Sequence, residues 1–215
     1  MNPGYFFIIM CWILIILILT EWLDFLWPDA VDQEKARRKA VIFLIMLVIL
    51  QGFSIPIHSR INLNLGSIVL ITVVGLYNFI KDQSGLRLQM LSVILFLGIF
   101  YGVAYEMLIM DPILMVLSPL YILPAFLVIF LLLTTNQIEL QWLMLAAGFI
   151  LGEIVHKIFL YKHVEQIFIG DALFRDHLMM GFLMLTVATY VLSYMKKLIL
   201  YSIRVLASYR KQEGS

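Results

Sequence analysis

The sequence predicts an all-α fold, a polytopic transmembrane helical bundle of about seven spans in which residues 1–215 form a single integral membrane domain. The first reason is composition: 63% of the residues are hydrophobic and 13% are charged, whereas soluble domains have about 45 to 50% apolar and about 25% charged residues. The second is that most apolar stretches approach the roughly 20 residues that a helix needs to cross a bilayer. The third is that charged residues gather between these stretches, in segments too short for a soluble domain.

The apolar stretches are interpreted as spans, and they cover residues 5–26, 41–57, 65–80, 88–110, 112–133, 141–160 and 178–200. The first has no basic residue before it and no small-residue cleavage site after it, so we interpret it as an uncleaved span and not as a signal peptide. The third is short and barely apolar, and if it is re-entrant every later segment reverses its direction. In the fifth, Pro112, Pro119 and Pro124 predict a kink or a late start, because proline lacks a backbone N–H.

The basic residues predict an N-out, C-in orientation. The cytosolic side then receives 11 of the 15 basic residues. These are Lys35, Arg37, Arg38, Lys39, Lys81, Arg87, Lys196, Lys197, Arg204, Arg210 and Lys211, while Arg60, Lys157, Lys162 and Arg175 stay outside. We therefore expect a multi-pass protein of the cell membrane that contacts the lipid bilayer and has no nucleic-acid partner. A membrane-protein partner or a homo-oligomer is left open.

Two pairs of glycines occur at a spacing that allows close helix packing. Gly98 and Gly102 lie in the fourth stretch, and Gly148 and Gly152 lie in the sixth. A Gly-x-x-x-Gly spacing puts both glycines on one helix face, where a neighbouring backbone can approach. Packing of the two helices against each other, homodimerisation and chance all fit this pattern. If the two helices pack here, leucine at these positions should destabilise the fold and alanine should be mild.

Aromatic residues near the ends of the stretches are interpreted as interfacial anchors in preference to a cofactor site. They are Trp22, Trp27, Tyr101, Tyr105, Tyr121, Trp142, Tyr161 and Tyr194.

Ionisable residues at membrane depth are the candidates for a functional site, because a charge in a span is costly unless it is paired or faces water. Glu106 lies one turn before the end of the fourth stretch, Glu153, His156 and Lys157 lie in the last turns of the sixth, and His177 precedes the seventh. In the predicted orientation all of them are in the outer half. Further polar residues fall on the same side: His58, Arg60, His163, Glu165, Asp171, Arg175 and Asp176. We expect Glu106, Glu153 and His156 to face the protein interior.

Three interpretations of this candidate polar cluster remain open, and the first is favoured. Glu153 and Lys157 have an i, i+4 spacing and could neutralise each other. The residues could instead line a proton or substrate pathway. Glu153 and His156, at i, i+3, could also bind a divalent cation together with His177 or His163. We assign no metal ligands and no cofactor.

Catalytic signatures give no support for an enzyme, so catalytic residues stay unknown and enzymatic activity stays uncertain. The sequence has no phosphate-binding loop, no His-Glu-x-x-His and no Gly-x-Ser-x-Gly. Cys11 is the only cysteine, which excludes an internal disulfide and a thiolate-rich metal site. Two hypotheses follow. The first is a non-enzymatic assembly or interaction role in the membrane. The alternative is a small transporter or metal-dependent membrane enzyme that uses the outer Glu and His residues.

The general layout resembles the YphA-like membrane proteins of spore-forming Firmicutes. The features that carry the resemblance are the chain length, the opening residues Asn2 to Phe6, a basic first cytosolic loop and a basic tail. The resemblance implies a bacterial cytoplasmic membrane location with a link to sporulation. It carries over no catalytic residue, since that family has no established activity.

Overall fold

The computed structural model describes residues 2–23, 32–69, 72, 87–111, 117–161 and 163–213. The chain is mostly helical. The helices are α1 (Tyr5–Leu19), α2 (Gln33–Leu50), α4 (Arg87–Met110), α5 (Pro119–Thr134), α6 (Ile138–Leu160) and α7 (Ala172–Glu213). Three short strands accompany them: β1 (Ser54–His58), β2 (Ile61–Asn64) and β3 (Ile167–Ile169).

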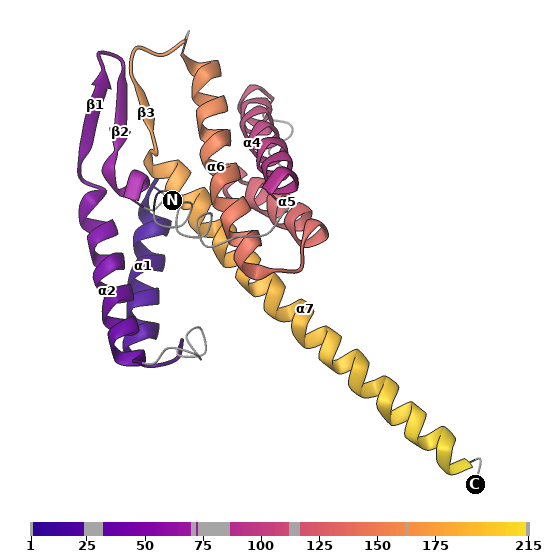
Figure 1. The fold of residues 1–215 in the computed structure, drawn as a ribbon. Helices are drawn as coiled ribbons and strands as arrows, with labels where there is room; N and C mark the ends of the chain where they lie inside the picture. The colour runs from indigo at the N-terminus through magenta and orange to yellow at the C-terminus, as the bar shows by residue number, and fades with distance from the viewer. Residues whose placement is uncertain are drawn as a thin grey trace.

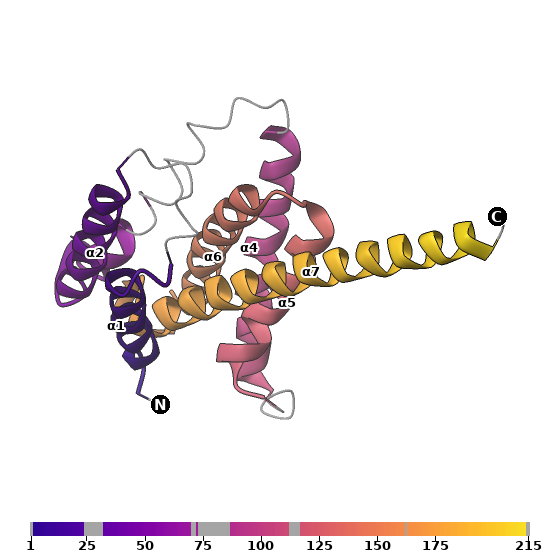
Figure 2. The ribbon, with the colours of Figure 1, turned by 90° about the horizontal axis from the view of Figure 1, so that it is seen from below.

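The helices form two groups that α7 connects (Figure 1). In one group α1 and α2 lie side by side, and in the other α4, α5 and α6 pack together. The N-terminal part of α7 packs against α1, α5 and α6, while its C-terminal part projects far beyond the rest of the molecule (Figures 1 and 2). With 42 residues at about 1.5 Å per residue, α7 is about 63 Å long. This is about twice the thickness of a bilayer's hydrocarbon core.

The first two helices differ from the stretches predicted for them. α1 ends at Leu19, and α2 begins at Gln33, so the basic residues from Lys35 to Lys39 belong to a helix and not to a loop. The reason is a capping interaction, because the Asp32 carboxylate accepts a hydrogen bond from the backbone N–H of Lys35. Hydrogen bonds from Lys35 also hold the pKa of Asp32 below its ordinary value.

The all-α expectation is wrong in one respect, because the fold contains a three-stranded sheet in the order β1-β2-β3. β1 pairs antiparallel with β2, and β2 pairs parallel with β3, with Ile61 opposite Ile167. Residues 54–57, predicted as the end of the second span, therefore belong to an edge strand. Pro56 is tolerated there because an edge strand can present a residue without an N–H.

Three described helices are long and apolar enough to cross a membrane, and they cover Leu88–Met110, Leu140–Leu160 and Ala172–Ser202. α1 and α5 are apolar but shorter. α5 begins late, at Pro119, as the prolines of that stretch indicate, and Ser118 caps it by accepting from the N–H of Leu120. Most of the third predicted span lies outside the described residues, and so does the prediction that it crosses the membrane or is re-entrant.

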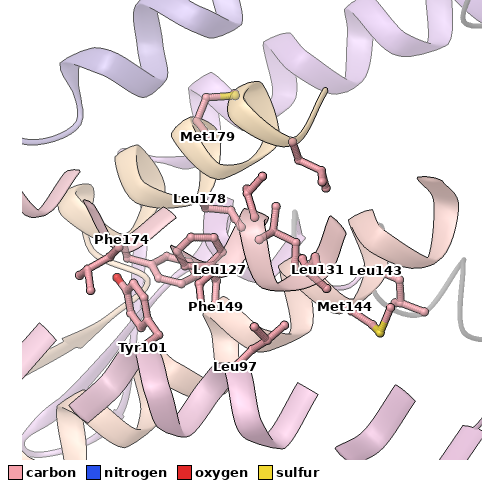
Figure 3. Packing of buried hydrophobic residues seen from close by; sticks show 14 of the residues in the cluster. Leu97, Tyr101, Leu127, Leu131, Leu143, Met144, Phe149, Phe174, Leu178 and Met179 are labelled. Carbon is pink, nitrogen blue, oxygen red and sulfur yellow. The ribbon is translucent and has the colours of Figure 1, made fainter. Parts of the chain in front are cut away.

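Most of the hydrophobic core lies between α4, α5, α6 and α7 (Figure 3), and it extends to Phe7 and Cys11 of α1 and Leu47 of α2. Phe149 of α6 is at its centre and contacts the ring of Tyr101 edge to face, with 5.0 Å between the ring centroids. Leu97 of α4, Leu131 of α5 and Leu178 of α7 complete the packing and are buried. The outer faces of the same helices carry exposed apolar residues, such as Leu95, Phe96 and Ile99, which suits contact with lipid.

Candidate functional site

The four glycines lie where α4 and α6 approach each other most closely. A Cβ atom built on Gly98 would lie 2.7 Å from Cβ of Leu151, and one built on Gly148 would lie 2.8 Å from Cβ of Leu97. At Gly152 the nearest atom would be Cδ1 of Tyr101, at 2.4 Å. Each glycine therefore makes room for a side chain of the opposite helix. The close approach places the end of α4 beside the end of α6, and with it their ionisable residues.

The expectation that alanine would be mild at these glycines is wrong. A Cβ on Gly102 would lie 2.6 Å from Cγ1 of Val155 and 2.9 Å from the backbone oxygen of Gly152. Carbon atoms in contact prefer separations of about 3.5 to 4.0 Å. A single methyl group thus already forces the two backbones apart.

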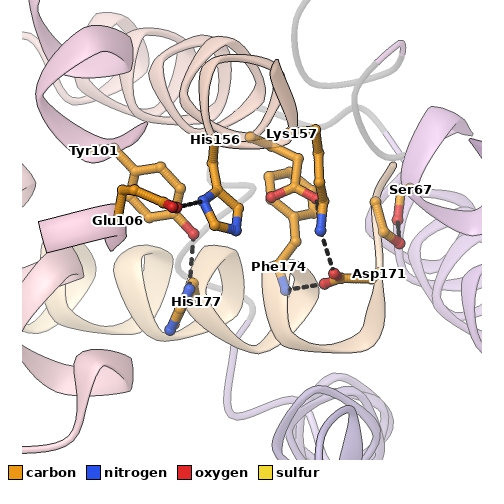
Figure 4. A network of polar contacts seen from close by, with 10 residues as sticks. Ser67, Tyr101, Glu106, His156, Lys157, Asp171, Phe174 and His177 are labelled. Atoms are coloured by element: carbon orange, nitrogen blue, oxygen red, sulfur yellow. Dashed lines mark hydrogen bonds and ion pairs between the residues drawn. The ribbon is translucent and has the colours of Figure 1, made fainter. Parts of the chain in front are cut away.

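Glu106 and His156 meet across the contact between α4 and α6. Oε2 of Glu106 lies 3.0 Å from Nδ1 of His156, and the side chains are 15% and 4% exposed. The two groups form an ion pair when the imidazole is protonated. Figure 4 shows them beside the other polar residues of this end of the bundle.

Glu153 is paired along its own helix and not with His156. Nζ of Lys157 lies 3.3 Å from Oε1 of Glu153 and 2.6 Å from Oδ2 of Asp171. Asp171, just before α7, also caps that helix by accepting from the N–H of Phe174 at 2.9 Å. A single ammonium group therefore joins two carboxylates from α6 and from the start of α7. The i, i+3 spacing of Glu153 and His156 does not bring them to a common partner.

Tyr101 and His177 form a second buried polar pair. The hydroxyl of Tyr101 lies 2.7 Å from Nδ1 of His177, and both residues are 1% exposed. The ring of Tyr105 lies between the two histidines, with centroids 4.4 Å from His156 and 5.4 Å from His177. The interpretation of Tyr101 and Tyr105 as interfacial anchors is therefore wrong. They are one helical turn apart on the face of α4 that also carries Gly98 and Gly102, which is the signal that could have placed them inside.

Asp176 attaches the N-terminus of the chain to α7. Its carboxylate accepts hydrogen bonds from the backbone N–H of Gly4 at 2.7 Å and of Phe7 at 2.8 Å. Gly4 is the N-cap residue of α1 and Phe7 lies in its first turn, so neither N–H has a partner within the helix. The positive charge of that helix end also favours a carboxylate.

Replacing Asp176 with alanine is expected to loosen the start of α1, because two charge-assisted hydrogen bonds are lost. The expected loss of stability is about 1 to 3 kcal/mol. Hydrogen exchange measured in nanodiscs should show faster exchange at the Gly4 and Phe7 amides. The matched control is Asp32→Ala, which removes an exposed cap at α2 and should leave these two amides unchanged. Unchanged exchange in Asp176→Ala would refute the attachment.

The sheet is attached to the same end of the bundle. Ser67 donates a hydrogen bond to the backbone oxygen of Gly170 at 2.7 Å, and Arg175 donates to Oδ1 of Asn64 at 3.2 Å. Gly170 has φ +72°, and a Cβ there would lie 2.4 Å from Cβ of Ser67. Glycine is required for both reasons, since the left-handed conformation and the close approach each exclude a side chain.

The sequence-predicted cluster is thus brought together in part. Glu106, Glu153, His156, Lys157 and His177 lie at one end of the bundle with Asp171 and Asp176, whereas His58 and His163 are exposed. Within the described ranges, no three His, Cys, Asp or Glu side chains are placed to hold a metal ion. Sequence reasoning missed the roles of Tyr101, Tyr105, Asn64 and Ser67.

Comparisons with known proteins identify the family. Residues 3–213 match the sequence profile of the YphA-like integral membrane proteins. No curated protein and no solved structure matches the chain. Because the profile covers nearly the whole chain, and because the resemblance in layout pointed to the same group, the chain belongs to the YphA-like integral membrane protein family.

Proposed function

We propose that this chain is a seven-span protein of the cell membrane, N-out and C-in, with a non-enzymatic assembly or interaction role. The observation that carries the proposed role is that residues 191–202 of α7 are all exposed, and they include Leu198, Ile199 and Leu200. A crossing that begins at Ala172 needs only about 20 residues. These leucines and isoleucine follow Lys196 and Lys197, which the charge bias puts at the cytosolic interface.

The contacts at the polar end of the bundle support the seven spans. The sheet joins the segment after α2 to the segment after α6, and Asp176 holds the N-terminus at the same end. The pair of Glu106 and His156 holds the end of α4 there too. These contacts are consistent with an even number of crossings between Asn64 and Glu106. In the proposal the two crossings are α4 and the third predicted span, at residues 65–80 and mostly outside the described residues, and the total of seven puts the two termini on opposite sides.

Topology reporters test this arrangement. A reporter fused after residue 213 should be read as cytosolic, and one inserted between Asp32 and Gln33 should also be read as cytosolic, because the basic residues beside both positions favour that side. A reporter inserted at Ser59, between β1 and β2, should be read as external. A C-terminal reporter read as external would contradict the proposed orientation.

The internal pairing of the polar residues supports a non-enzymatic role. Each carboxylate of the cluster has a partner in the chain: Glu106 has His156, Glu153 and Asp171 share Lys157, and Asp176 binds backbone amides. These contacts join α1, α4, α6 and α7 into one unit. On α7, residues 191–202 form an exposed apolar stretch that packs against none of these helices.

Cross-linking tests the role of α7. Cys11 is the only cysteine and is buried, so Cys11→Ala gives a background for single cysteines at positions 191, 192, 194, 195, 198 and 199. Mild oxidation or a short cross-linker in native membranes should give adducts with a second copy or with another protein, and their yield should follow the helical period. Cysteines at Leu95 and Ile99 on the exposed face of α4 serve as controls and should give none. Equal yields at all positions, or no adduct on α7, would overturn the proposed role.

A small transporter is the second candidate, and one observation favours it. Nε2 of His177 is buried and has no hydrogen-bond partner among the described residues. A buried polar atom without a partner is unfavourable, and in membrane helices ionisable groups of this kind line ion and proton pathways. Uptake of a labelled ion into proteoliposomes, abolished in His177→Phe, would support this candidate over the first.

A further inference from the structure

We propose that His156 and His177, together with Tyr101, Tyr105 and Glu106, form a proton-binding site inside the helical bundle in which the two histidines titrate as a coupled pair. The ligand of this site is the proton. The proposal is independent of the role proposed for α7, because it rests on side chains at the opposite end of that helix.

The hydrogen bonding of His177 defines how its ring is protonated in the neutral state. If the hydroxyl of Tyr101 donates to Nδ1, only the Nε2–H lacks a partner. If Nδ1–H donated instead, both the Tyr101 hydroxyl hydrogen and the Nε2 lone pair would lack one within the described chain. Buried polar groups without partners are costly. The first arrangement is therefore preferred, and it puts the ring proton of His177 on Nε2.

His156 is the second member of the site and has the opposite kind of partner. Its Nδ1 faces a carboxylate oxygen of Glu106 at 3.0 Å, and neither atom has another hydrogen-bond partner among the described residues. This carboxylate can stabilise a proton on His156. The Glu106 side chain is 15% exposed, compared with 4% for His156. Glu106 is thus the member of the site that a proton from water reaches first.

The ring of Tyr105 contacts both imidazoles. Its ring meets both histidine rings edge to face, at interplanar angles of 69° and 86°. Two histidines in contact with the same ring are close enough for the charge on one to act on the other, and little water lies between buried groups to screen it. Their protons are then bound in two coupled steps.

The charges that surround the pair come from three elements. α4 contributes Tyr101, Tyr105 and Glu106, and α6 contributes Glu153 and Lys157. Asp171 lies before α7, and α7 itself contributes Arg175 and Asp176, which faces the first turn of α1. α1 and α5, which also pack against α7, contain no Asp, Glu, Lys, Arg or His within their bounds.

Proton uptake changes one hydrogen bond in a defined way. When His177 gains a proton, both ring nitrogens carry hydrogen, so Nδ1–H donates to the hydroxyl oxygen of Tyr101. The hydroxyl hydrogen must then turn away from the imidazole. The site gains one proton from water and one positive charge, and no covalent bond between heavy atoms changes. The contact between α4 and α7 is therefore sensitive to the protonation of His177.

Nuclear magnetic resonance of the full chain in nanodiscs tests the site. With histidine labelled at its ring carbons and nitrogens, a His58→Gln, His163→Gln background leaves only the two buried imidazoles visible. The histidine that binds its proton second in the parent should have its titration midpoint raised by about one pH unit or more when the other histidine is replaced by glutamine, because its proton then no longer binds beside a positive charge. Unchanged midpoints in both His156→Gln and His177→Gln would overturn the proposal.

A second variant keeps the test decisive if a histidine variant fails to fold. Tyr101→Phe removes only the hydroxyl. In the parent, ring nitrogen shifts should report the Nε2–H form of neutral His177, and in Tyr101→Phe the population of the Nδ1–H form should rise. Tyr121→Phe, at an exposed residue of α5, is the matched control and should change neither. A parent in the Nδ1–H form, or a tautomer ratio unaffected by Tyr101→Phe, would refute the assignment.

Discussion

Gly102→Leu and Gly148→Leu are each expected to lower the thermal unfolding midpoint in detergent more than any other single substitution proposed for the α4–α6 contact. Even a Cβ would lie 2.6 Å from Val155 Cγ1 at Gly102 and 2.8 Å from Leu97 Cβ at Gly148. Overpacking costs about 1 to 3 kcal/mol for small insertions, and leucine adds three more carbons at the closest point between two backbones. Membrane helices have little apolar driving force to restore the contact, because lipid is as apolar as leucine.

The corresponding alanine variants extend this prediction. Gly102→Ala should destabilise by about 1 to 3 kcal/mol, since the backbone oxygen of Gly152 cannot turn aside as a side chain can. Gly52→Ala is the matched control, because its Cβ would meet only an ordinary contact of 3.7 Å with the oxygen of Ile49. If Gly102→Leu and Gly148→Leu unfold at the temperature of the parent, the packing of α4 on α6 is not as described, and the meeting of Glu106 with His156 loses its basis.

Lys157→Met is expected to destabilise the chain by about 3 to 5 kcal/mol, because removing one partner of a buried ion pair leaves an uncompensated charge. Glu153, whose side chain is 4% exposed, would lose its ion-pair partner. Asp171 is 33% exposed and can be hydrated, so Glu153 is the group responsible. Unfolding by denaturant or heat in detergent measures the change.

The double variant Lys157→Met with Glu153→Gln separates the loss of the pair from the loss of the lysine stem. Neutralising Glu153 removes the unpaired charge, so a substantial part of the stability should return. Lys35→Met is the control, because Lys35 pairs with Asp32 at an exposed site and exposed pairs contribute little. If the double variant is no more stable than Lys157→Met, the buried charge is not the cause of the loss.

Sequence patterns located the central helices well, because in a membrane the end of an apolar run and the end of a spanning helix coincide. The stretch predicted at residues 88–110 corresponds to α4, and the one at 141–160 corresponds to α6. The seventh stretch was predicted at 178–200, whereas α7 begins at Ala172. Hydropathy assigns the three polar residues before that stretch to a loop, and these are Arg175, Asp176 and His177. They are helical because each binds a partner in another segment.

The sheet was missed for a related reason. Residues 54–57 continue an apolar stretch, and nothing in their spacing distinguishes a strand from the end of a span. Their strand character depends on β2, which itself pairs with a segment about 100 residues later, between Ile61 and Ile167. Local periodicity carries no information about such a parallel pairing.

The sequence alone determined the class of protein, the positions of the principal helices and the identity of most ionisable residues at the polar end of the bundle, because hydrophobicity and helical spacing are local properties. Only the tertiary structure decided which groups meet. The i, i+3 spacing of Glu153 and His156 places both on one side of α6, but Glu153 pairs with Lys157 while His156 meets Glu106. These pairings depend on the depth and rotation of α4 and α7 relative to α6. The glycine contacts and the attachment of Asp176 to the N-terminus determine both. Each buried charge then pairs with the nearest complementary group.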